Sequence, residues 1–113
     1  MYKVVYSETS RDQIRSLHPS IKSLIKSRIE ELAGDPYVGK PLQRELAGYY
    51  SFGAKRFRII YKISNPNKTL QIYHIGHRKD IYELLKEILK TGSMSSFMKS
   101  LTSPFARSNF GTG

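Results

Sequence analysis

Apolar and polar residues recur along this chain in patterns that predict seven secondary-structure elements. Runs rich in β-branched and aromatic residues predict strands over residues 2–6, 49–53, 56–63 and 69–75. Apolar residues spaced three or four positions apart predict helices over residues 7–17, 20–33 and 80–89. The expected order is therefore β-α-α-β-β-β-α.

The third predicted strand, RFRIIYKI over residues 56–63, has the clearest alternation. One face carries Phe57, Ile59, Tyr61 and Ile63, and the other carries Arg58 and Lys62. Three consecutive strands with short connections imply an antiparallel meander, to which the first strand must add. We expect an α+β fold in which this antiparallel sheet packs against a helical hairpin and a C-terminal helix, with the helices on one face.

Capping residues support the limits of the helices. Ser7 and Ser20 can act as N-caps of the first two helices, and Gly34 suits the position after the second. His74, on the fourth strand, can be a hydrogen-bonded core residue. After the second helix, a polar loop is expected over residues 35–48.

The composition changes at residue 91, after which Ser, Gly and Thr dominate. We therefore expect one domain over residues 1–90 and a disordered C-terminal tail over residues 91–113. The alternative is a short helix that docks on a partner through one side, made of Phe97, Met98, Leu101 and Phe105.

Charge narrows the class of partner. Lys and Arg outnumber Asp and Glu by 19 to 9, and the net charge is +10. Such a field attracts polyanions, nucleic acid first and acidic proteins second. The chain has no Cys, so thiolate metal sites and disulfides are excluded. We expect a cytoplasmic protein with no bound metal, and no apolar run suggests a membrane partner.

One stretch, IGHRKDIYE over residues 75–83, places three nitrogen-rich side chains where a strand ends and a helix begins. These are His77, Arg78 and Lys79, and Tyr82 follows one helical turn after Arg78. A plain connection needs no such cluster, so the pattern indicates a phosphate site at the rim of the sheet.

The order and spacing of several short motifs resemble the RelE/ParE superfamily of toxins from bacterial and archaeal toxin–antitoxin pairs. The motifs are LHP at residues 17–19, DP at 35–36, GKPL at 39–42, ELAGYY at 45–50, FRIIY at 57–61 and IGHRKDIY at 75–82. The resemblance covers residues 2–90. The Gly-His-Arg strand end with its following Tyr points to the RelE branch more than to the gyrase-inhibiting ParE branch.

This resemblance implies a ribosome-dependent messenger RNA endoribonuclease that needs neither metal nor cofactor and is silenced by a cognate antitoxin. It implies the ribosome and mRNA as further partners. Two alternatives remain open: a ParE-like toxin that binds gyrase without chemistry, and an inactive relative that binds only antitoxin or RNA.

The resemblance also suggests roles for individual residues. Arg58 is the expected phosphate ligand, because a guanidinium matches phosphate oxygens bidentately. Arg78 resembles the family Arg that steadies the phosphate and the leaving oxygen, although it could instead pair with Asp80 or Glu83. Tyr82 resembles the family Tyr near the scissile bond, or it is a half-buried helix residue.

His77 is the fourth catalytic candidate, since imidazole suits proton transfer at neutral pH. The expected RNA-binding cations are Lys55, Arg56, Lys62 and Lys79. The chain departs from the family at Ser51 and Gly53, where two basic residues are common. Lys55 and Arg56, or His77, can replace them. The sequence leaves the general base, the codon preference and the toxin–antitoxin stoichiometry open.

Overall fold

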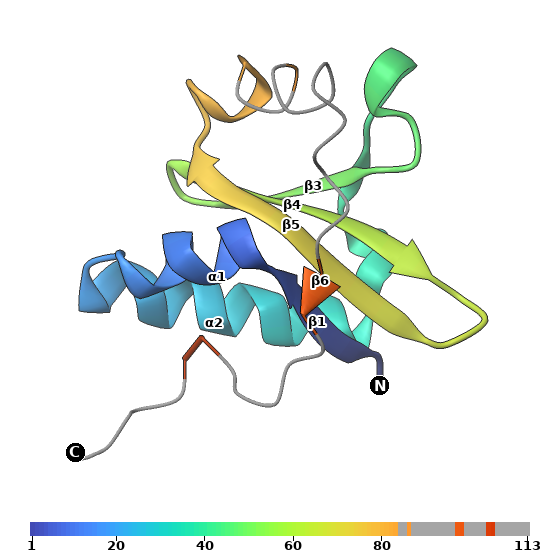
Figure 1. Ribbon diagram of the computed structural model, residues 1–113, viewed down its shortest axis with the longest axis horizontal. Helices are drawn as coiled ribbons and strands as arrows, with labels where there is room; N and C mark the ends of the chain where they lie inside the picture. Colours follow the sequence, from blue (N-terminus) through green and yellow to red (C-terminus); the bar gives the residue numbers. More distant parts are fainter. Residues whose placement is uncertain (84–85, 87–96, 99–103, 106–113) are drawn as a thin grey trace.

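The computed structural model describes residues 1–83, 86, 97–98 and 104–105 (Figure 1). Its six strands form one sheet in the order β2-β3-β4-β5-β1-β6. The helices are α1 (Glu8–Arg15) and α2 (Pro19–Gly34), with short 3-10 turns at Pro36–Val38 and Arg44–Leu46. The strands are β1 (Lys3–Ser7), β2 (Lys40–Pro41), β3 (Tyr50–Ala54), β4 (Phe57–Ser64), β5 (Thr69–His77) and β6 (Phe97–Met98). The predicted α+β class is confirmed.

The centre of the sheet is the predicted meander of β3, β4 and β5. Gly53 lies opposite Arg58, which in turn lies opposite Gly76. The sheet is mixed rather than purely antiparallel, because β1 pairs with β5 in parallel, with Lys3 opposite Thr69. This corrects the expected antiparallel sheet: hydrophobic alternation predicts a strand but carries no information about its direction.

Helix α1 begins where β1 ends, beside the second half of β5. Its N-cap Ser7 accepts a hydrogen bond from the Ser10 N–H, which confirms the predicted cap. The Ser7 and Ser10 hydroxyls donate to the carbonyls of Tyr73 and Ile72 at 2.7 and 3.0 Å. Gln13 Oε1 accepts from the Ile75 N–H at 2.7 Å. Side chains of the N-cap and of α1 thus bind backbone groups of β5 at the point where its pairing with β1 ends.

Helix α2 begins one residue before the predicted start. His18, not Ser20, is the N-cap: its Nδ1 accepts from the Ser20 N–H at 3.2 Å. Pro19 takes the first helical position, where its missing N–H costs nothing. Gly34 is the last helical residue, and Asp35 caps the end.

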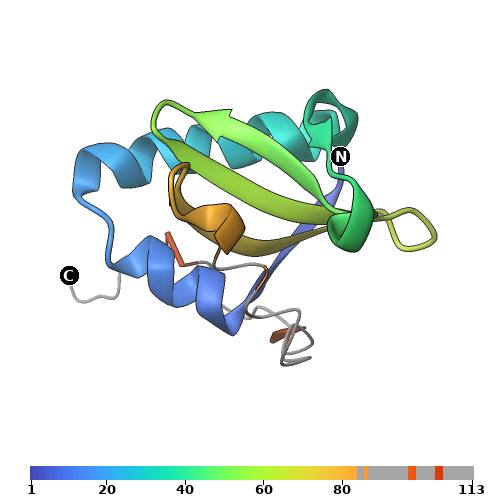
Figure 2. The same ribbon diagram turned by 90° about the horizontal axis from the view of Figure 1, so that it is seen from above.

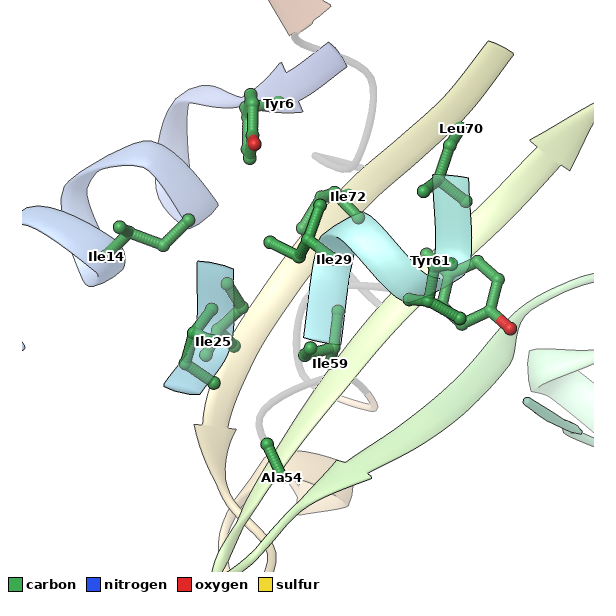
Figure 3. Packing of buried hydrophobic residues seen from close by; sticks show 11 residues of the cluster. Tyr6, Ile14, Ile25, Ile29, Ala54, Ile59, Tyr61, Leu70 and Ile72 are labelled. Atoms are coloured by element: carbon green, nitrogen blue, oxygen red, sulfur yellow. The ribbon is translucent and has the colours of Figure 1, made fainter. Parts of the chain in front are cut away.

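Both helices pack on one face of the sheet and bury the larger core there (Figures 1 and 3). Ile14 of α1 and Ile25 and Ile29 of α2 meet Ile59 and Tyr61 of β4. The Tyr61 hydroxyl donates to the Pro36 carbonyl at 2.6 Å, and burial raises the pKa of this phenol. The core thereby fixes β4 in the middle of the sheet.

A second apolar cluster lies on the opposite face and consists of Leu46, Tyr49, Ile60, Tyr73 and Ile81. Residues 81–83 and 86 are helical, within the helix predicted over residues 80–89 (Figure 2). Residue 80 is part of the preceding turn, and residues 84–85 and 87–89 lie outside the described part. The expectation that this helix shares the face of α1 and α2 is wrong, because Ile81 packs into the second cluster on the opposite face. Ile81 reaches over Gly76, where a β-carbon would lie 3.0 Å from its Cδ1.

Two pieces of the segment predicted to be disordered lie against the domain. Residues 97–98 pair antiparallel with β1, so they are extended rather than helical. The Phe105 ring meets Tyr6 edge to face at 6.2 Å. Leu101 and residues 106–113 lie outside the described part, and a boundary at residue 90 stays a prediction. In the part of the chain that the structure describes, no helix is long and apolar enough to cross a bilayer.

Candidate phosphate-binding site

Arg58 lies on the face of β4 opposite α1 and α2. Phe57 and Ile59 pack against the helix-side core, whereas Ile60 belongs to the second cluster. Alternation therefore places Arg58 on the face of Ile60. Its guanidinium lies over β3, because a β-carbon built at Gly53 would come within 3.2 Å of Nη1. The missing side chain at position 53 gives this guanidinium its place.

Tyr82 reaches the same face from the helical turn after β5. Its hydroxyl lies 3.2 Å from Ser51 Oγ, and its half-buried ring packs on the second cluster. Ser51 and Gly53 are two residues apart on β3 and share a face, with about 7 Å between their Cα atoms. The phenol of Tyr82 and the guanidinium of Arg58 thus lie over neighbouring positions of one strand.

Arg78 follows the last residue of β5. Its N–H donates to the Arg56 carbonyl at 2.8 Å, which extends the ladder by one step. Arg78 is the first residue of the turn after β5 and is exposed, at the same end of the sheet as the turn that holds Arg56. The only ion pair among the described residues joins Arg28 and Glu31. The alternative pairing of Arg78 with Asp80 or Glu83 is therefore absent in this part of the chain.

His77 lies on the other side of the sheet. It is paired with Phe57, and the two rings meet at 5.9 Å with 61° between their planes. Its Nδ1 accepts a hydrogen bond from the Lys79 N–H at 3.4 Å. The fold does not bring His77 together with Arg58 and Tyr82, because it shares the helix-side face of Phe57.

The four expected RNA-binding cations are spread around this end and the adjoining face. Lys55 and Arg56 form the exposed turn between β3 and β4, and Lys79 is exposed after β5. Lys62 is half-buried, with Nζ 4.8 Å from the centre of the Tyr49 ring. Lys55 and Arg56 lie close to Arg58 in sequence, whereas Lys62 is drawn toward the second cluster.

The second cluster forms an apolar floor beside Arg58 and Tyr82. The rings of Tyr49 and Tyr73 meet edge to face at 5.1 Å. Burial raises the pKa of Tyr49 and raises that of Tyr73 to about 12, so both phenols stay neutral at physiological pH. The cluster itself is therefore uncharged, and the positive potential on this face comes from Arg58 and from Lys62 above the Tyr49 ring.

Sequence reasoning missed the roles of Ser51 and Gly53. Their lack of charge was interpreted as a gap in a basic pattern. In the fold, Ser51 Oγ accepts a hydrogen bond from the Tyr82 hydroxyl, and Gly53, which has no side chain, leaves space for the Arg58 guanidinium. The available signal was the predicted antiparallel pairing of their strand with the strand of Arg58.

Comparison with known proteins places the chain in a family. Residues 4–82 match the model described as the ParE toxin of the type II toxin–antitoxin system parDE. The chain is 36% identical over 83 residues to Toxin RelG of Mycobacterium tuberculosis, a match that covers 72% of this chain and 95% of that protein. The chain therefore belongs to the RelE/ParE superfamily, and it is a toxin of the kind found in toxin–antitoxin systems.

Solved structures agree with this assignment. The RelBE2 toxin–antitoxin complex from Mycobacterium tuberculosis is 34% identical, with a TM-score of 0.62 over 68% of this chain and 98% of the matched chain. The isolated RelE toxin of E. coli has a TM-score of 0.61 over 78% of this chain and 99% of that one. Its identity is 18%, so this second likeness concerns the fold alone.

Proposed function

We propose that this toxin is a metal-free endoribonuclease that cleaves messenger RNA on the ribosome and so arrests translation. The observation that carries the proposal is the approach of the Arg58 guanidinium and the Tyr82 hydroxyl to adjacent positions on β3, at Gly53 and Ser51. Together they offer a fixed cation and a phenolic O–H within reach of one ribose–phosphate linkage.

The proposed reaction is attack by the ribose 2′-oxygen on the adjacent phosphorus. A bond forms from O2′ to phosphorus and the bond to O5′ breaks, which leaves a 2′,3′-cyclic phosphate and a free 5′-hydroxyl. One proton leaves O2′ and one is delivered to O5′. Arg58 binds the non-bridging oxygens bidentately, and Arg78 adds charge stabilisation as negative charge develops.

Tyr82 is the proposed proton-exchanging group of this chain. Its hydroxyl forms a hydrogen bond with Ser51, which holds Oη on the Arg58 face, beside the proposed place of the phosphate. The ring can also stack on a base and hold the attacking and leaving oxygens in line. His77 has no part in this step, since it lies on the other face of the sheet.

The proposed partners are a cognate antitoxin, the ribosome and mRNA, all in the cytoplasm. The similar RelBE2 structure is itself a toxin–antitoxin complex. A net charge of +10 favours an acidic antitoxin segment over the Arg58 face, which would compete with RNA for the same cations.

Cleavage mapping with and without ribosomes tests this function. We expect cuts in mRNA only on ribosomes, with cyclic phosphate ends, and their loss in Arg58→Ala and Arg78→Ala. A second candidate, gyrase binding without chemistry, is favoured by the description of the matching family model as a ParE toxin. Intact mRNA together with inhibited gyrase supercoiling would overturn the nuclease proposal and support that candidate.

A further inference from the structure

A cleft of about 460 Å³ opens on the helix side of the same sheet end. It is lined by Ile21 of α2, Lys55 and Arg56 of the turn between β3 and β4, Phe57 of β4, and His77 of β5. Arg58, Tyr82 and Ser51 are not among these residues. The cleft is therefore separate from the proposed cleavage site.

The walls and the mouth of the cleft differ in chemistry. Ile21 and Phe57 are apolar, and the Phe57 and His77 rings meet at 61°, which makes a corner of two aromatic planes. Lys55 and Arg56 are exposed at the turn, and neither belongs to the one ion pair in the described residues. An apolar aromatic corner with two cations beside it complements a flat ring that carries an anion.

The orientation of His77 adds a polar contact. Its Nδ1 accepts from the Lys79 N–H at 3.4 Å, so the ring is held from the side of the turn. Nε2, on the far side of the ring, is the nitrogen available to a ligand. It can hydrogen-bond to the edge of a base or to a ribose hydroxyl.

We infer that this cleft binds one nucleotide of single-stranded RNA, with the base against Phe57 and His77 and its phosphate at Lys55 and Arg56. This rests on the proposed function, because it supposes that RNA occupies the Arg58 face. Phe57 and Arg58 are adjacent and point to opposite faces. An RNA strand passing around the turn between β3 and β4 thereby meets Arg58 with one linkage and the cleft with a nearby nucleotide.

A nucleotide fits these features better than an acidic peptide does. A carboxylate side chain would satisfy the cations but leave the aromatic corner to a separate residue. A nucleotide brings a planar π-system and an anion on one unit, which is the combination that RNA-binding surfaces recognise by stacking and charge.

The first experiment titrates adenosine 5′-monophosphate into the full-length Arg58→Ala protein, in which the cleavage site is disabled. We expect NMR shifts of the His77 imidazole and the Phe57 ring, with weaker shifts from adenosine and none from inorganic phosphate. Lys55→Gly should weaken binding roughly fivefold, as expected for one exposed charge pair. Glycine suits this position, where φ is 58°.

The matched control is Lys68→Gly. Lys68 also has a left-handed backbone, with φ of 48°, and lies in the turn between β4 and β5 at the other end of the hairpin (Figure 1). It should leave nucleotide binding unchanged. Equal shifts with inorganic phosphate alone, or shifts with a Glu- and Leu-rich peptide but not with the nucleotide, would overturn the inference. Arg56→Ala provides a second variant at an exposed position.

A cleavage assay on ribosomes separates this inference from the proposed function. Reduced cleavage by Lys55→Gly, with normal cleavage by Lys68→Gly, supports both. If Lys55→Gly cleaves normally and the nucleotide causes no NMR shifts at the cleft, the nucleotide-binding inference is wrong and the nuclease proposal is unaffected. If the nucleotide binds in a way that depends on Lys55 but no mRNA is cleaved on ribosomes, the nuclease proposal is wrong and the nucleotide-binding inference holds.

Discussion

The guanidinium of Arg58 occupies the space above Gly53 on the neighbouring strand, with Nη1 3.2 Å from the point where a β-carbon would stand. Gly53→Ala should therefore displace the guanidinium by a few tenths of an ångström. Because such misplacement is costly in a positioned site, we expect about a tenfold loss of ribosome-dependent cleavage. Stability should change by no more than about 1 kcal/mol. Cleavage rates and urea unfolding measure the two effects.

Gly34→Ala is the matched control for this change. No atom lies within 4 Å of a β-carbon at Gly34, which ends α2 on the surface. It should leave cleavage intact and raise the free energy of unfolding by up to about 1 kcal/mol. If Gly53→Ala cleaves as fast as the native chain, the position of Arg58 does not matter to the reaction.

A positive charge alone should not substitute for the Arg58 guanidinium in cleavage. Arg58→Ala should lower cleavage about 10²- to 10³-fold, the typical cost of removing one donor to a developing anion. Arg58→Lys should recover only part of this, since an ammonium cannot bind two phosphate oxygens in a fork. Single-turnover cleavage on ribosomes measures both. Arg15→Ala, an exposed change at the end of α1, is the control for net charge, and an equal loss there would point to general electrostatics.

The hydroxyl of Tyr82 can be separated from its ring. Tyr82→Phe keeps the packing on the second cluster and removes the 3.2 Å contact with Ser51. If the hydroxyl exchanges a proton, cleavage should fall about 10²-fold, with unfolding changed by about 1 kcal/mol or less.

Ser51→Ala tests the same contact from its other end. It leaves the Tyr82 phenol in place without its partner, so we expect a much smaller loss of cleavage than with Tyr82→Phe. Equal losses in the two variants would mean that the hydrogen bond positions the ring and that the phenol carries no proton in the reaction.

Acidification should destabilise the fold through His74. Gln13 Oε1 accepts from the Ile75 N–H, so its Nε2 faces His74 Nδ1 at 3.2 Å and donates to it. Burial lowers the pKa of this imidazole below its ordinary value of 6.5. The unfolded chain therefore takes up the proton first. The contribution of neutral His74 to the free energy of unfolding is fully present above about pH 6.5, the ordinary pKa of the unfolded imidazole. It is lost as the pH falls below that, by at most about 1.4 kcal/mol per pH unit.

Urea unfolding between about pH 7.5 and 5 measures this slope. His74→Gln keeps a polar side chain but cannot titrate, so its stability should be flatter across the same range. A slope unchanged by the substitution would assign the pH dependence to other groups. The prediction of His74 as a hydrogen-bonded core residue is confirmed by its contact with Gln13 and its burial.

The elements with long, regular patterns could be predicted from sequence. The apolar spacing in α2 and the alternation in β4 are dictated by one-sided burial, and both elements lie within one residue of their expected ends. The two-residue strand β2 could not be predicted, because Lys40–Pro41 is too short to show a period. Its pairing with β3 depends on the path of the loop around it.

Only those parts of the candidate site that depend on strand alternation could be predicted from sequence. Alternation placed Arg58 on the correct face, since Phe57 and Ile59 define the buried one. His77 was interpreted as part of a turn, whereas β5 continues through it, and its side chain then follows Ile75 to the helix side. The predicted antiparallel pairing brings the strand of Ser51 and Gly53 beside that of Arg58, but it does not fix the register that sets Gly53 opposite Arg58.

The parallel pairing of β1 with β5 has a consequence for how the protein is made. Residues 3–6 are synthesised long before their partners, residues 69–72. The helical hairpin can form during synthesis, but the sheet cannot close until β5 has emerged. Tyr82 follows still later. The sheet, and with it the contact between Tyr82 and Ser51, can therefore form only after the whole segment from β1 to Tyr82 has been synthesised.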